Sequence, residues 1–210
     1  MRARTPVVLG CILTAVLIAN GSAQESSEVR SPVGVSWVTV TIQGTSNRGP
    51  FIASSKTVRV ARVQLSTPRS TAILEQVRRP GGFEAFDVAL PVTTLTSPDQ
   101  GVDEHIHASL KADAHPEIRF QLRSIADGST DAMGSVHLDA KGTLTVAGVD
   151  REVIFSVDVL RAYRSLLVDG STDLLMTDFG VDPPRGRLGM LRTDPRIHVR
   201  FYLVVTAEDE

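Results

Sequence analysis

Side chains that could bind a metal or transfer a proton gather near the middle of the sequence, at Asp103, Glu104, His105 and His107. On a helix, residues two apart point about 200° away from each other, so these imidazoles could share a metal only with ligands from elsewhere. His115 stands just before Pro116 and could act as a general acid or base, although a helix stop explains this pair better. We therefore predict no metal site and no catalytic residue.

Other patterns that carry chemistry do not occur in the sequence. It contains no Gly-x-Ser-x-Gly nucleophile elbow, no phosphate-binding glycine loop and no dinucleotide fingerprint. Two small basic clusters, Arg78-Arg79 and Arg185 with Arg187, are expected at the surface, where one could meet a phosphate group of a ligand. The net charge of −2 excludes a basic field that would attract nucleic acid. We predict no cofactor.

The first 23 residues have the layout of a cleaved secretory signal peptide. Arg2 and Arg4 form a basic start, residues 7–19 are mostly apolar, and small residues end the segment at Gly21-Ser22-Ala23. A membrane anchor needs about 20 apolar residues, and this stretch is shorter. A lipoprotein is the other alternative, because residues 8–11 loosely match a lipid-attachment box. We expect cleavage after Ala23 and a periplasmic or secreted protein.

Cleavage would leave a polar leader over residues 24–33 and one domain over residues 34–207. It would also remove Cys11, the only cysteine, so the mature chain would contain no disulfide and no thiolate metal ligand. Such a chain depends on a buried apolar core for its stability. The hydrophobic content of 42% is sufficient for a globular domain of this kind.

The elements of that domain are predicted by alternating apolar and polar residues, the pattern of half-buried strands. The apolar faces are Val38, Val40 and Ile42; Val58 and Val60; Phe86, Val88, Leu90 and Val92; Ile118, Phe120 and Leu122; Val136 and Leu138; Leu144 and Val146; Val153, Phe155, Val157 and Val159; and Ile197, Val199, Phe201, Leu203 and Val205. Turns are expected at residues 44–50, at Gly142, at residues 147–150 and at Asp169-Gly170. Residues 66–82 stay unassigned.

One amphipathic helix is predicted over residues 98–114, between strands. Ser97 and Pro98 form its expected start, and Val102, Ile106 and Leu110 form one apolar stripe. About eight strands and one short helix indicate an all-β protein with an antiparallel sheet that closes on itself or folds into a sandwich. In a barrel, such a helix would cover one end.

Three segments resemble sequence elements of YceI-like proteins. Leu110-Lys111-Ala112 with residues 115–120 is similar to that family's "LKA…HPxIxF" element, and residues 142–153 are similar to its "G-LTI-GV-R-V" hairpin. Residues 176–184, which read MTDFGVDPP, and the last strand are similar to its closing element. The segments follow one another in the family's order, between residues 37 and 205.

The resemblance implies a periplasmic or secreted bacterial protein with a lipocalin-like antiparallel β-barrel. It further implies that the barrel binds an isoprenoid or a similar long lipid without catalysis. We expect no nucleic-acid partner and no stable membrane span after signal cleavage, and the oligomeric state is left open.

The residues expected to line the barrel and contact the lipid are Phe120, Leu122, Leu144, Val146, Phe155, Val157, Phe179, Val199, Phe201 and Leu203. A barrel of about eight strands either is filled by its own side chains or has room for one narrow ligand. The alternative is therefore a filled barrel that acts as a structural or interaction protein of the cell envelope. The interior volume distinguishes the two.

Overall fold

The computed structural model describes residues 33–66, 76, 80–98, 102–126, 128–184 and 192–207. The predicted signal peptide, the leader up to residue 32, and most of the unassigned segment 66–82 lie outside these residues, as do Arg78, Arg79, Arg185 and Arg187.

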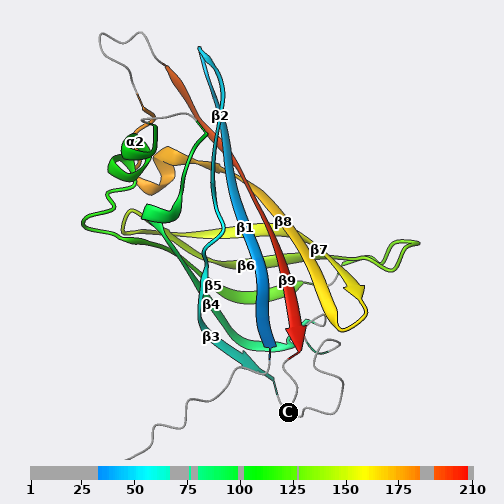
Figure 1. The fold of residues 1–210 in the computed structure, drawn as a ribbon. Coiled ribbons are helices and arrows are strands. Elements are labelled where there is room, and N and C mark those ends of the chain that lie inside the picture. The colour runs from blue at the N-terminus through cyan, green and yellow to red at the C-terminus, as the bar shows by residue number, and fades with distance from the viewer. Residues whose placement is uncertain are drawn as a thin grey trace, which may run out of the picture. The chain divides into compact units, whose positions relative to one another are not determined.

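The strands form a single antiparallel sheet, which confirms the predicted all-β class, with nine strands rather than about eight. Their order across the sheet is β2-β1-β9-β8-β7-β6-β5-β4-β3 (Figure 1). The bounds are β1 Val33–Ser46, β2 Gly49–Ser55, β3 Arg59–Leu65, β4 Phe83–Pro91, β5 Glu117–Ala126, β6 Val136–Val146, β7 Val149–Ala162, β8 Ser165–Leu175 and β9 Thr193–Ala207.

The sheet curls because its two edge strands are successive parts of the chain. Residues 56–58 join β2 to β3 directly, and these strands pair with opposite ends of the sheet. One short segment therefore brings the two edges together. The seam is further joined by Ser54 of β2 and Thr96, which follows β4; they exchange backbone hydrogen bonds of 2.8 and 2.9 Å.

Two predicted turns are wrong, and both were predicted from a glycine. Gly142 lies inside β6 opposite Leu122, and Gly170 lies inside β8 opposite Phe201. Each glycine is needed because an aromatic ring occupies the space where a side chain would be, not because the chain turns. The turn expected at residues 147–150 is confirmed at Ala147-Gly148, where both residues have positive φ, as a tight hairpin requires.

The turn expected over residues 44–50 is shorter than predicted and consists of Asn47 and Arg48. β1 continues to Ser46, and β2 begins at Gly49. The count rises from eight to nine because β2 and β8 were not predicted, whereas β6 was predicted as two strands. The inward side chains of β2 are Phe51 and Ala53.

The predicted helix ends earlier than residue 114, and residues 99–101 of its expected first turn lie outside the described residues. α2 spans Val102–Ser109, and the residues after it form turns, because Lys111 adopts a left-handed conformation with φ of 55°. Two short 3₁₀ helices, η1 (Val92–Thr94) and η2 (Met176–Phe179), follow β4 and β8. None of the helices in the described residues is long and apolar enough to cross a membrane.

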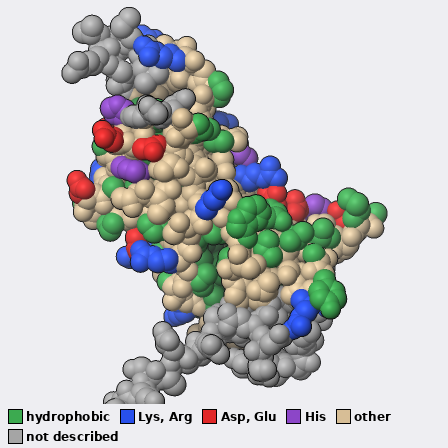
Figure 2. Space-filling view, in the orientation of Figure 1, with side chains coloured by type: hydrophobic (Ala, Val, Ile, Leu, Met, Phe, Trp, Pro, Cys, Tyr) green, Lys and Arg blue, Asp and Glu red, His purple; other side chains and the backbone are tan. Residues whose placement is uncertain are grey.

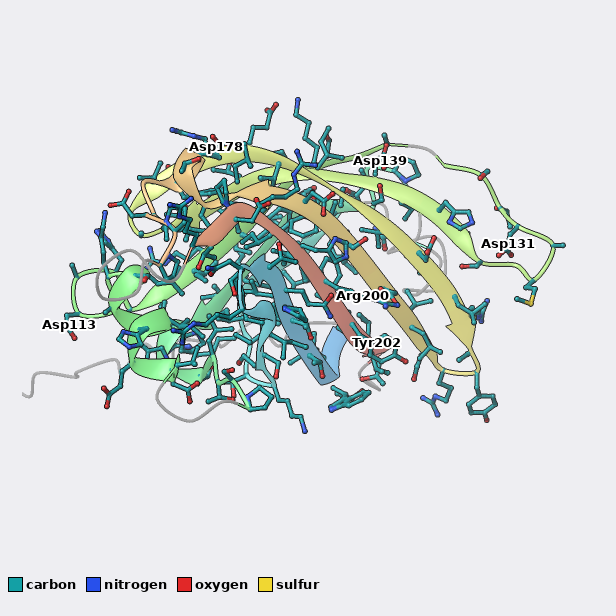
Figure 3. All side chains as sticks on the ribbon, turned by 90° about the horizontal axis from the view of Figure 1, so that it is seen from above. Asp113, Asp131, Asp139, Asp178, Arg200 and Tyr202 are labelled. Atoms are coloured by element: carbon teal, nitrogen blue, oxygen red, sulfur yellow. The ribbon has the colours of Figure 1, made fainter. Side chains whose placement is uncertain are left out.

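Side chains fill the interior of the curled sheet unevenly. Toward the β7–β8 hairpin, a dry core includes Leu166, which has no exposed surface, with Val159 and Val205. Toward α2 the interior is open and contains the cavity described below. Figure 3 shows side chains crowding the concave side of the sheet.

Candidate ligand-binding site

The interior holds an apolar cavity of about 250 Å³. Among the described residues that line it, Ser109 is the one with a polar side chain. A cavity of about 150 Å³ is enough to bind benzene, and pockets for drug-sized ligands begin at about 300 Å³. The barrel is therefore hollow on the α2 side, which argues against the filled-barrel alternative.

Eight of the ten residues predicted to line the barrel surround this cavity. They are Phe120, Leu144, Val146, Phe155, Phe179, Val199, Phe201 and Leu203. Their place in the wall follows from strand alternation, since each is on the concave face of its strand or, for Phe179, at the end of η2. Their contact with a ligand remains a prediction.

The other two predicted residues, Leu122 and Val157, lie outside the cavity. Leu122 is beside a register shift in β5 and faces a separate small depression together with Phe83 and Ile125. Val157 is buried in the dry core near the β7–β8 hairpin. Alternation assigned both to the inner face correctly, but it carries no information about depth along the barrel.

Several lining residues were not predicted as such. Val38, Val40 and Ile42 line the cavity from β1, and Phe86, Val88 and Leu90 line it from β4. Ile106 lines it from α2, and Leu110 lines it from the turn directly after α2. The sequence could have predicted them as lining residues, because it placed them on the apolar faces of the predicted strands and helix. Phe51 and Ala53 belong to β2, whose alternation was not recognised.

Aromatic rings form a continuous arc in the wall. Phe155 of β7 stacks edge-on against Phe120 of β5 on one side and against Phe201 of β9 on the other, each with ring centroids 5.5 Å apart. Such edge-to-face pairs contribute about 0.5–1.5 kcal/mol beyond their burial and hold the rings in place. One side of the cavity is therefore a fixed aromatic surface.

The helix α2 is fastened over the cavity by two polar contacts. The backbone N–H of Ser97 donates to Asp103 Oδ1 at 2.6 Å, and His107 Nε2 donates to the carbonyl oxygen of Leu95 at 2.9 Å. These contacts keep Ile106 of the helix, and Leu110 directly after it, against the cavity. His107 is thus a structural tether, whereas His105 is exposed.

The histidines of the described residues lie apart from one another. No three His, Cys, Asp or Glu side chains come together there in a way that could hold a metal ion. The ring of His115 packs over Gly148, and His137 and His198 are on the outer face of the sheet, paired with Asp158 and Asp173.

The outer wall is polar where the inner wall is apolar. Arg200 on β9 donates from Nε to Asp169 Oδ1 on β8 at 2.9 Å, and a second contact joins the same two groups. The hydrogen bond and the negative charge of Asp169 raise the pKa of Arg200. Hydrophobic side chains also gather on part of the outer surface (Figure 2). Tyr163 is exposed and Trp37 is half-exposed.

Comparison with solved structures identifies proteins of the same fold. BcnA of Burkholderia cenocepacia has a TM-score of 0.59 at 16% identity, covering 80% of this chain and 95% of that one. A polyisoprenoid-binding domain from Saccharophagus degradans, implicated in plant cell wall breakdown, has a TM-score of 0.61 at 10% identity, covering 84% and 99%. The Campylobacter jejuni YceI protein has a TM-score of 0.54 at 15% identity, covering 75% and 85%.

Comparison of the sequence with curated proteins finds no significant match. The YceI-like domain, in contrast, matches residues 24–205, which include the whole curled sheet except its last residues. The chain therefore belongs to the YceI-like family.

Proposed function

We propose that the protein binds an isoprenoid or a similar long apolar lipid inside its barrel, and that it does so without catalysis. The observation that carries the proposal is the apolar cavity of about 250 Å³ beneath α2. The ligand class is supported by the Saccharophagus degradans domain, which is described as polyisoprenoid-binding and shares the fold.

Apolar burial would supply the binding energy. Each Å² of apolar surface removed from water contributes about 25 cal/mol, or about 0.8 kcal/mol per buried CH₂ group. The described residues of the cavity wall include one polar side chain, that of Ser109, and so offer little to orient a polar headgroup. The apolar chain would therefore occupy the cavity with part of its length, and a headgroup would remain outside.

A carrier without catalysis is consistent with the polar groups near the cavity. His107 is engaged with Leu95, and Asp103 with the backbone of Ser97, so both are occupied in holding α2. General acid–base catalysis needs a group within hydrogen-bonding reach of the reacting atom. Among the described residues that line the cavity, the apolar chain would meet no such group.

We further propose that the protein acts in the bacterial periplasm after removal of residues 1–23. The basic start, apolar stretch and small residues before Gln24 support export. N-terminal sequencing of the protein from its host should return Gln24 as the first residue. An intact Met1 would contradict this part of the proposal.

Binding is tested with purified protein and a polyprenol. The lipid should displace a fluorescent apolar probe such as 1-aminoanthracene, reach saturation near one equivalent, and raise the melting temperature, because a ligand that binds only the folded state stabilises it. A short-chain alcohol of matched headgroup is the control. If the polyprenol neither displaces the probe nor changes the melting temperature, the proposal fails.

A further inference from the structure

Two glycines of the barrel wall each lie directly under a phenylalanine ring of the neighbouring strand. Gly44 of β1 is paired with Phe51 of β2, and Gly170 of β8 is paired with Phe201 of β9. Both rings line the cavity. Neither glycine has a positive φ, so neither is required by a turn or by backbone strain.

The rings occupy the space that a side chain would need. A Cβ atom on Gly44 would lie 2.6 Å from Cε1 of Phe51, and one on Gly170 would lie 2.5 Å from Cε1 of Phe201. Real Cβ atoms essentially never approach another heavy atom closer than 3.0 Å. An alanine at either position would therefore force the ring away from the wall, and the open space lies on the cavity side.

Small and large residues alternate around this part of the wall. Ala140 of β6 stands opposite Phe155 of β7, and Gly170 of β8 stands opposite Phe201 of β9. Gly142 of β6 also lies under a ring, that of Phe120, but its Cβ would in addition meet the backbone oxygen of Gln121. Gly44 and Gly170 are the positions where the ring alone excludes a side chain.

We propose that Gly44 and Gly170 determine the width of the ligand cavity and thereby its specificity for methyl-branched chains over straight ones. The inference rests on the proposed function. While the rings lie over the glycines, the cavity keeps room for the methyl branches of an isoprenoid. Rings displaced inward by an added methyl group would leave a narrower slot that admits only an unbranched chain.

The test compares Gly170→Ala with the double variant Gly170→Ala/Phe201→Leu, using a prenol and a straight-chain alcohol of equal length. Gly170→Ala should weaken prenol binding about tenfold, the cost of overpacking by one methyl group, and should change binding of the straight chain less than about threefold. The double variant should restore prenol binding to within about threefold, because the smaller side chain removes the clash.

The control is Ser171→Ala, one residue further along β8, whose side chain is on the outer face; it should bind both alcohols like the wild type. Equal binding of the prenol by wild type and Gly170→Ala would overturn the inference, as would equal losses for both alcohols. Gly44→Ala with Phe51→Leu provides an independent second pair if Gly170→Ala does not fold.

Xenon binding, followed by ¹²⁹Xe NMR, separates this inference from the proposed function, since xenon enters an apolar cavity without reference to any lipid. Xenon affinity should fall in Gly170→Ala and recover in the double variant. That result without prenol binding by the wild type would refute the proposed function and the specificity for branched chains, and would leave only the control of cavity width by the glycines standing. If the wild type binds prenol but Gly170→Ala has the xenon affinity of the wild type, the inference about the glycines is refuted and the proposed function is not.

Discussion

Ser54 and Thr96 exchange two backbone hydrogen bonds, from Ser54 N to Thr96 O at 2.8 Å and from Thr96 N to Ser54 O at 2.9 Å. They join β2, one edge of the sheet, to the segment that follows β4, next to the other edge. The hydroxyls of the adjacent Ser55 and of Thr94 share a further hydrogen bond of 2.6 Å. The barrel is thus closed by a short polar seam beside an apolar cavity.

Removing the Ser55 hydroxyl should open this seam. Ser55 is 2% exposed, and its Oγ also accepts from the backbone N–H of Thr57 at 3.1 Å. Ser55→Ala leaves that N–H without its partner, so the free energy of unfolding should fall by about 1–3 kcal/mol in urea denaturation. The control Ser171→Ala should stay within about 0.5 kcal/mol of the wild type. Equal stability of the two variants would show that the Ser55 hydroxyl contributes nothing to the seam.

Two leucines of β8 should distinguish the filled end of the barrel from its hollow end. Leu166 is completely buried in the dry core, whereas Leu174 lines the cavity. Leu166→Ala should lower the free energy of unfolding by about 2–5 kcal/mol. Leu174→Ala should lower it less, because its cavity-facing surface lacks packing partners already. A larger loss for Leu174→Ala would indicate that the α2 end is packed in solution.

The single tryptophan should not detect a lipid inside the barrel. Trp37 is 53% exposed on the outer face and stacks edge-on against Tyr202, with ring centroids 5.5 Å apart. A bound alkyl chain that carries bromine atoms quenches by contact and should leave the fluorescence of Trp37 unchanged. The matched reporter, Phe86→Trp in a Trp37→Phe background, points into the cavity and should be quenched strongly. Quenching of Trp37 alone would place the lipid on the outer surface.

The apolar stripe of α2 should contribute to binding. Ile106 lines the cavity, and its neighbour His105 is exposed. Ile106→Ser removes apolar contact with the ligand and should weaken prenol binding roughly tenfold in the probe-displacement assay. His105→Ser, on the same helix, should bind like the wild type. Identical affinities for the two variants would mean that the helix does not cover the bound chain.

Period-two alternation was enough to predict seven of the nine strands in the described residues and most of the cavity wall. It identified Phe120, Phe155 and Phe201 as inward-facing residues, and the structure brings their rings together. It did not separate Val157, in the dry core, from Phe155, at the cavity, although both are on the same face of β7. Depth along a barrel depends on the shape of the whole sheet, which no local pattern encodes.

The glycines were the main source of error. Asp169-Gly170 has the composition of a hairpin turn, so β8 was not recognised, and Gly142 divided β6 in two. Glycine in a strand also marks a place where another group approaches the backbone closely. The group here is a ring on a neighbouring strand, Phe201 over Gly170 and Phe120 over Gly142, and only the pairing of strands reveals it.

Native mass spectrometry of the protein purified from its own host tests the central claim most directly. A hollow apolar barrel that binds a long lipid should carry a noncovalent adduct of one isoprenoid or similar lipid per chain, lost on collisional activation. In Gly170→Ala expressed in the same host, the occupied fraction should fall. A wild-type protein that shows only the mass of its own chain, before and after incubation with polyprenol, would contradict the claim.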